Sequence, residues 1–174
     1  MLDKINVLIS EERINKRIQE IAEQILKDYN DEEIILVCIL SGAVYFTVEL
    51  SRKIKSGLVK LDFMKVSCYG DNTQTTGNIE FKLDISNDIE DKNVIIVEDI
   101  IDTGITLSFL YDYLKEKNPK TLKICVLLDK KERREKDIKV DYVGFEIENK
   151  FVVGYGLDYA GKYRELPYVG YIKG

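Results

Sequence analysis

Histidine, the commonest general base of enzymes, is absent from this sequence of 174 residues. Any group that takes up a proton near neutral pH must therefore be a carboxylate, a lysine, a tyrosine or a cysteine. Cysteine is scarce too, and the spacing of the three present matches neither a disulfide framework nor a metal site, which favours a reducing cytoplasm. Cys38 and Cys125 lie in apolar, strand-like runs and are expected in the core, whereas Cys68 stands at a loop entrance and is open to reaction.

Long apolar runs and an excess of positive charge are lacking as well. No stretch approaches the roughly 18 apolar residues of a membrane span, and acidic and polar residues come too early at the N-terminus for a signal peptide. The net charge of −5 argues against a general nucleic-acid binder, because such proteins neutralise phosphates with basic residues. One local basic group is present and is first interpreted as a solvated turn: Lys130, Lys131, Arg133 and Arg134.

The apolar residues that are present alternate between strand-like and helical spacing. A hydrophobic content of 45% fits one domain over residues 1–174. Helices are predicted after Ser10, over 45–54 and over 107–117, and strands over 34–40, 59–66, 94–97, 122–128, 142–145 and 151–155. This alternation predicts an α/β fold with a mainly parallel central sheet flanked by helices. Ligands bind at the carboxyl ends of such strands, where the loops 41–43, 67–78, 99–106 and 129–134 fall.

The most informative stretch is residues 94–107, where an apolar strand ends in Glu98 and Asp99. Two adjacent carboxylates that leave a buried strand repel each other and lose hydration, so they need cations or hydrogen-bond donors nearby. Asp102 or Thr103 alone would be interpreted as a helix cap, but a third carboxylate makes a purely structural role insufficient.

The loop that follows has the composition of a phosphate site. It lacks the lysine of a nucleotide P-loop. It does offer Gly104 for close backbone approach, two hydroxyls, and amides at the start of a helix. Carboxylates can hold a sugar diol or a metal, so the stretch predicts a site for a phosphorylated ribose.

The sequence V-E-D-I-I-D-T-G-I-T in this stretch resembles the phosphoribosyl-pyrophosphate motif of the type I phosphoribosyltransferases, in the form found in hypoxanthine–guanine phosphoribosyltransferases. Other segments agree in order and spacing: Leu40-Ser41-Gly42-Ala43, Tyr69-Gly70, Leu127-Leu128-Asp129-Lys130 and residues 150–159. The resemblance runs from about residue 5 to the C-terminus. It implies the type I phosphoribosyltransferase fold, with a core over about 30–145, a small hood from the N-terminal segment and about 146–174, and a flexible lid loop over 67–78.

The resemblance also implies roles for the phosphoribosyl end of the site. Glu98 and Asp99 would bind the ribose hydroxyls of phosphoribosyl pyrophosphate, directly or through Mg²⁺, and Asp158 would hold a second Mg²⁺. Asp102, also beside the ribose, would face N7 of the purine as general base or hold the transferred proton. Four residues would cradle the 5′-phosphate: Thr103, Gly104, Ile105 and Thr106. Pyrophosphate would meet three residues, in the family partly through a non-proline cis peptide: Ser41, Gly42 and Arg164.

At the purine end, the resemblance implies that Lys130 donates to the 6-oxo oxygen and that Phe151 stacks on the base. The Val152 carbonyl would accept from an exocyclic amino group, and Asp158 would border the same pocket. Without the resemblance, Phe151 would be assigned to the core, and Lys130 and Arg164 to the surface. The lid would contain three residues: Cys68, Tyr69 and Gly70. Two departures from the family pattern bear on side-chain roles: Ser41 replaces a common lysine or arginine, and Cys68 replaces a common serine.

The expected function is purine salvage, in which a transferase moves phosphoribose to hypoxanthine, and to guanine, giving IMP or GMP and pyrophosphate. A xanthine-preferring enzyme is the nearest alternative, and the relative preference among the three bases stays open. A regulatory protein that binds RNA or DNA would need a broad basic face, and a non-catalytic α/β scaffold would leave the carboxylates unexplained. The resemblance suggests a homodimer or homotetramer that binds neither nucleic acid nor membrane.

Overall fold

A computed structural model describes residues 5–54, 57–69 and 78–172. The strands are β1 (Ile5–Ile9), β2 (Ile34–Ile39), β3 (Val59–Tyr69), β4 (Asn78–Leu83), β5 (Asn93–Ile101), β6 (Thr121–Asp129), β7 (Tyr142–Glu146), β8 (Val152–Val153) and β9 (Val169–Ile172). The helices are α1 (Glu11–Tyr29), α2 (Val44–Lys53) and α3 (Ile105–Lys115), with a 3-10 turn η1 (Lys131–Arg133). None of the helices described is long and apolar enough to cross a membrane.

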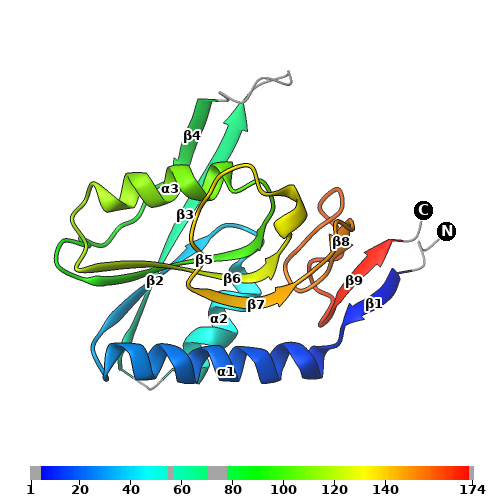
Figure 1. The fold of residues 1–174 in the computed structure, drawn as a ribbon, viewed down its shortest axis with the longest axis horizontal. Coiled ribbons are helices and arrows are strands. Elements are labelled where there is room, and N and C mark those ends of the chain that lie inside the picture. The colour runs from blue at the N-terminus through cyan, green and yellow to red at the C-terminus, as the bar shows by residue number, and fades with distance from the viewer. Residues whose placement is uncertain (1–4, 55–56, 70–77, 173–174) are drawn as a thin grey trace.

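Six strands form the central sheet in the order β4-β3-β2-β5-β6-β7 (Figure 1). All neighbours pair in parallel except β3 and β4, which are antiparallel. The central strand β2 is buried along its whole length, which explains its continuous apolar sequence. This arrangement confirms the predicted α/β fold and brings the carboxyl ends of β2, β5 and β6 to one edge.

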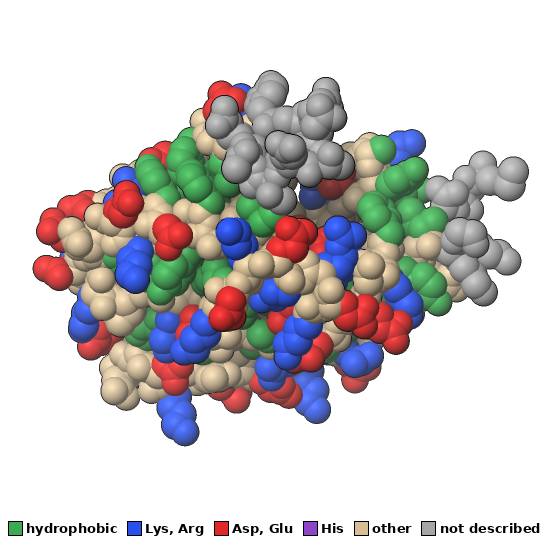
Figure 2. Space-filling view, turned by 45° about the horizontal axis from the view of Figure 1, so that its top comes forward, with side chains coloured by type: hydrophobic (Ala, Val, Ile, Leu, Met, Phe, Trp, Pro, Cys, Tyr) green, Lys and Arg blue, Asp and Glu red, His purple; other side chains and the backbone are tan. Residues whose placement is uncertain are grey.

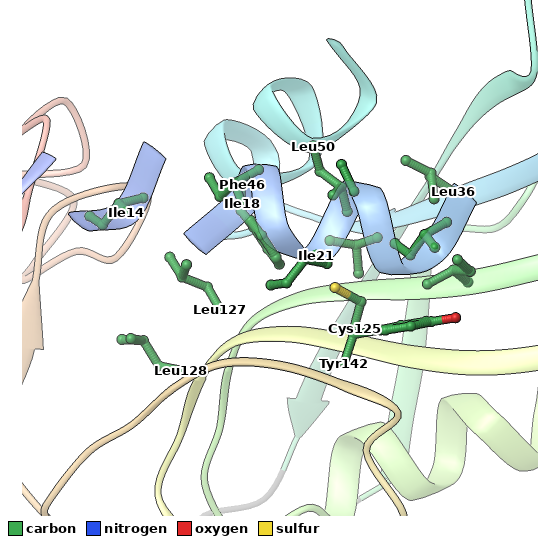
Figure 3. Packing of buried hydrophobic residues seen from close by; sticks show 14 of the residues in the cluster. Ile14, Ile18, Ile21, Leu36, Phe46, Leu50, Cys125, Leu127, Leu128 and Tyr142 are labelled. Carbon is green, nitrogen blue, oxygen red and sulfur yellow. The ribbon is translucent and has the colours of Figure 1, made fainter. Parts of the chain in front are cut away.

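Helices cover both faces of the sheet, with α1 and α2 on one side and α3 on the other (Figure 1). Ser10 caps α1, because its hydroxyl accepts a hydrogen bond from the Arg13 amide at 3.4 Å. The isoleucines spaced along α1 are buried against the sheet, beside Phe46 and Leu50 of α2 and Leu36 of β2 (Figure 3). Cys38 and Cys125 are buried free thiols, as predicted, and burial raises the pKa of Cys38 to about 11.

A second, small antiparallel sheet has the order β1-β9-β8. It joins segments from opposite ends of the sequence, since Asn6 pairs with Tyr171 and Val152 also pairs with Tyr171. Figure 1 shows this sheet beside the ends of β6 and β7. It contains the segments from which a hood was predicted.

Several predicted boundaries differ from the structure. Ser67 to Tyr69 belong to β3 and Asn78 to β4, so the predicted loop 67–78 was wrong at both ends. These polar residues form strands because antiparallel pairing satisfies their backbone groups, as where Cys68 faces Ile79. The predicted strand 151–155 is only Val152–Val153, and β1, β4 and β9 were missed. Gly70 and the rest of the predicted lid up to Gly77 lie outside the described residues.

Candidate active site

The loop after β2 approaches the predicted carboxylates closely. The peptide bond between Leu40 and Ser41 is cis. A Cβ atom on Gly42 would lie 1.6 Å from Oδ2 of Asp99, so only glycine fits there without a shift. A Cβ atom on Gly156, whose φ is +103°, would lie 1.9 Å from the carbonyl oxygen of Gly42. The segments around residues 42, 99 and 156 therefore pack closely together, because glycine leaves room at two of these positions.

Arg164 ties the loop after β8 together at this point. Its Nη2 lies 2.7 Å from Oδ1 of Asp158, and its Nη1 donates to the carbonyl of Gly156. The Gly161 amide donates to the second oxygen of Asp158 at 2.7 Å. The positive charge of Arg164 also lowers the pKa of Asp99 and so opposes the effect of burial. The structure thus brings Gly42, Asp99, Asp158 and Arg164, all predicted from sequence, to one edge of the sheet.

Glu98 and Asp99 form a tight acidic pair at the end of β5. Burial raises the pKa of Glu98 well above its usual range, and the neighbouring Asp99 raises it further. Burial also raises the pKa of Asp99, although hydrogen bonds and the charge of Arg164 offset part of this effect. The Ile100 amide donates to Oδ1 of Asp99 at 2.7 Å. A cation near this pair would relieve the electrostatic cost of ionising both groups.

This donor set fits Mg²⁺ with substrate oxygens completing its coordination. Mg²⁺ is typically held by one or two protein carboxylates together with waters and substrate phosphates. Among the described residues, no three histidine, cysteine, aspartate or glutamate side chains gather into a protein-only metal site. Glu98 and Asp99 would provide the hard oxygen ligands, while Asp158 in this structure is held by Arg164.

The predicted phosphate loop joins β5 to α3. Gly104 has a φ of +81°, which allows the chain to turn sharply before α3 begins at Ile105. The Thr103 hydroxyl accepts a hydrogen bond from the Ile105 amide at 3.4 Å. A hollow of about 70 Å³ opens beside the loop, lined by Glu98, Ile100, Ile101, Asp102, Thr103, Gly104, Thr106 and Leu107. The loop, the hollow and the start of α3 lie together, and backbone amides at a helix start are groups that can bind an anion.

Asp102 lies between two cations that follow β6. Nε of Arg133 is 2.9 Å from Oδ1 of Asp102. This ion pair is not aligned as a hydrogen bond, and the buried Oδ1 accepts none from the described residues. Burial lowers the pKa of Lys130, and the negative charge of Asp102 partly opposes that shift. Lys130 is only 8% exposed, so its assignment to the surface was wrong. Lys130 interacts with Asp102 through their opposite charges.

From the sequence, Arg134 was placed only in the basic group, yet its side chain is more enclosed than those of Lys131 and Arg133. Its Nη2 lies 2.5 Å from Oδ1 of Asp129, and the two side chains are 18% and 4% exposed. The solvated-turn interpretation therefore holds for Lys131 and Arg133 but is wrong for Lys130 and Arg134. The available signal was Asp129, an acid at the end of an apolar strand and directly before the basic group.

The predicted purine platform comprises Phe151 directly before β8, Val152 within β8, and the turn that follows this strand. Phe151 is 57% exposed, so its core assignment from sequence alone was wrong, and its ring meets the edge of Tyr159 at 5.6 Å. Val152 is buried in β8. No hydrogen bond or ring contact within the described part of the chain joins Phe151 to Lys130. Tyr159 was missed because a tyrosine in a polar turn carries no distinctive sequence signal.

Known proteins resemble this chain in both sequence and fold. The phosphoribosyl transferase domain family matches residues 8–160. A hypoxanthine phosphoribosyltransferase from Buchnera aphidicola is 48% identical, with 98% of this chain and 97% of that protein covered. A hypoxanthine-guanine phosphoribosyltransferase from Bacillus subtilis is 44% identical, with 96% and 92% covered. The crystal structure of a hypoxanthine-guanine phosphoribosyltransferase from Bacillus anthracis superposes with a TM-score of 0.93 at 46% identity, covering 98% and 100%.

Proposed function

The chain belongs to the phosphoribosyltransferase family, and we propose that it transfers the 5-phosphoribosyl group of phosphoribosyl pyrophosphate to hypoxanthine and guanine. The products are IMP or GMP and pyrophosphate. One observation carries this proposal: the acidic pair at the end of β5 lies between a close-packed glycine loop and an anion-sized hollow. A substrate with a phosphate at one end, a diol in the middle and a pyrophosphate at the other matches that sequence of groups.

The proposed roles follow from charge. Breaking the bond between C1 and pyrophosphate builds positive charge on the ribose ring, which the carboxylates of Glu98 and Asp99 stabilise while holding its hydroxyls. The backbone of residues 103–106 binds the 5′-phosphate, and the Ser41–Gly42 backbone with Arg164 binds pyrophosphate. Mg²⁺ held by Glu98, Asp99 and Asp158 would supply charge neutralisation for the leaving group. Asp102 takes or holds the proton at purine N7.

Selection of the purine base is assigned to residues that follow β6 and that lie at β8. Lys130 donates to the 6-oxo oxygen, Phe151 stacks on the ring, and the Val152 carbonyl accepts from an exocyclic amine. Support comes from the buried, electrostatically coupled position of Lys130 and from the open ring face of Phe151. Residues Cys68, Tyr69 and Gly70 remain the proposed part of a lid that excludes water.

We also propose that the enzyme forms a homodimer or homotetramer in the cytoplasm. Support comes from exposed apolar side chains on α2 and β3: Tyr45, Val48, Leu61 and Phe63. Leu61 is in register with Leu36, which packs toward α1 and α2, so these side chains share one side of the sheet. Sedimentation equilibrium should give at least twice the mass of one chain, and Val48→Asp should lower it. A monomeric wild type would refute the assembly.

A nucleic-acid-binding regulator is disfavoured by the net charge of −5 and by the face of the molecule that Figure 2 shows. Figure 2 shows acidic and basic side chains interspersed over the visible face rather than a continuous basic area. The test of the enzyme is a panel of hypoxanthine, guanine, xanthine and adenine with saturating phosphoribosyl pyrophosphate and Mg²⁺. We expect pyrophosphate release with hypoxanthine and guanine and little with adenine. A preference for xanthine would support the alternative, and no turnover with any 6-oxopurine would contradict both.

A further inference from the structure

Resting on the proposed function, we propose that Arg134 is a positioning residue for the 5′-phosphate. It does not line the phosphate hollow. It acts by fixing the orientation of the peptide groups that do, together with the backbone of the two residues after it.

The segment 134–136 donates hydrogen bonds to the outer side of the phosphate loop. Nε of Arg134 donates to the carbonyl of Asp102 at 3.4 Å. The amides of Glu135 and Lys136 both donate to the carbonyl of Thr103, at 2.9 and 3.1 Å. Two consecutive loop carbonyls are therefore held toward this segment.

Because the peptide bond is planar, the direction of each of these carbonyls also fixes the direction of the amide N–H group that follows it. In a trans peptide the C=O and the following N–H point in opposite directions. With the carbonyls of Asp102 and Thr103 held outward, the amides of Thr103 and Gly104 face the opposite side of the loop. That side carries the hollow lined by the same residues. The segment thus sets these amides toward the phosphate before any ligand arrives, which is the arrangement that binds anions well.

Arg134 is held in place from three directions at once. Its Nη2 pairs with the buried Asp129, its Nη1 donates to the carbonyl of Ile138 at 3.5 Å, and its Nε reaches the phosphate loop. Its Cδ lies 3.1 Å from where a Cβ on Gly104 would be, so its stem also packs against the loop. The rigid planar fork of a guanidinium spreads five donors over three nitrogen atoms, whereas the compact ammonium of lysine can replace the charge but cannot reach three separate acceptors in this geometry.

The test compares IMP with inosine, which differ only in the 5′-phosphate. Dissociation constants are measured by calorimetry for wild type, Arg134→Gln, Arg134→Lys and the control Lys131→Gln. Lys131 lies on the same turn and pairs with the exposed Glu146, so its substitution removes the same charge away from the loop. We expect both Arg134 variants to bind IMP at least about 10-fold more weakly, with the affinity for inosine changed less than twofold, since misplaced donors lose this much. Lys131→Gln should match wild type.

Full IMP affinity in Arg134→Lys would show that only the charge matters and would overturn the proposal. Equal weakening of IMP and inosine would do the same, because it would indicate a general structural defect. If Arg134→Gln does not fold, Arg134→Lys, which keeps a positive charge beside Asp129, decides the question. Wild-type protein that binds IMP no better than inosine would instead refute the phosphate site of the proposed function.

Discussion

The contact between Gly42 and Asp99 allows the effect of one methyl group to be worked out. In Gly42→Ala, the new Cβ would lie 1.6 Å from Oδ2 and 2.5 Å from Cγ of Asp99, whereas real Cβ contacts essentially never fall below 3.0 Å. Asp99 cannot turn away freely, because its Oδ1 accepts from the Ile100 amide at 2.7 Å. Either that bond breaks or the loop moves by the difference, about 1.4 Å.

Displacements of about 1 Å in a site can cost about 10²-fold in rate. We therefore expect kcat/KM for phosphoribosyl pyrophosphate to fall about 10²-fold in Gly42→Ala, which corresponds to about 2.7 kcal/mol of transition-state stabilisation. Overpacking should also lower the free energy of unfolding by about 1–3 kcal/mol. Steady-state kinetics that follow IMP formation, together with urea denaturation, measure the two effects separately.

Gly57→Ala is the matched control. Gly57 has a φ of +84° and no atom within 4 Å of its would-be Cβ, so alanine there adds backbone strain of about 1–2 kcal/mol without crowding. Stability should fall while kcat/KM stays near that of wild type. If Gly42→Ala keeps kcat/KM within threefold, the close approach to Asp99 does not position the site and the reasoning is wrong.

Three further substitutions test other parts of the molecule. Asp102→Asn should lower the rate constant of the chemical step about 10²-fold or more in pre-steady-state measurements, the scale of a lost general base. An unchanged rate constant would remove that role. Lys130→Ala should reduce the preference for hypoxanthine over adenine in the base panel. Because burial and the neighbouring Asp99 raise the pKa of Glu98, stability without Mg²⁺ should decline as pH rises from the unfolded-state pKa of this group toward its raised folded-state pKa, and Glu98→Gln should make this decline smaller in urea titrations.

A second dependence of stability on pH comes from the buried carboxylate of Asp62. Burial tends to raise the pKa of Asp62, but hydrogen bonds from Asn87, Ser86 and Phe63 outweigh it and lower the pKa below 3.8. The stability from this group is therefore complete above about pH 4 and is lost as pH falls through the lowered pKa. Asp62→Asn should cost about 2 kcal/mol at pH 7, since it leaves buried donors poorly matched. A loss that persists unchanged at pH 2.5 would contradict this account.

The sequence was sufficient where one local pattern determines the outcome. The isoleucines of α1 and the apolar run of β2 predict their elements because periodicity and burial agree. The convergence of Gly42, Asp99 and Arg164 was predictable only through the family resemblance, because contacts between distant segments leave no periodic signal.

The parts that were missed depend on tertiary context. The strand end at Cys68 is specified by its antiparallel partner, not by its own polar sequence. Arg134 looks like any surface arginine until Asp129 and the carbonyls of the phosphate loop are placed around it. Phe151 lies just before the two-residue β8 and is exposed, and composition does not reveal that strand boundary.

The small sheet has a consequence for when activity can first appear. The central sheet is complete once β7 has been synthesised, but β8 obtains its partner only with β9, the last strand described. The central sheet can therefore form without β8 and β9, whereas the small sheet needs segments from both ends of the chain. Catalytic competence would depend on this second step, so removal of residues 169–174 should yield a folded central sheet that does not turn over purine.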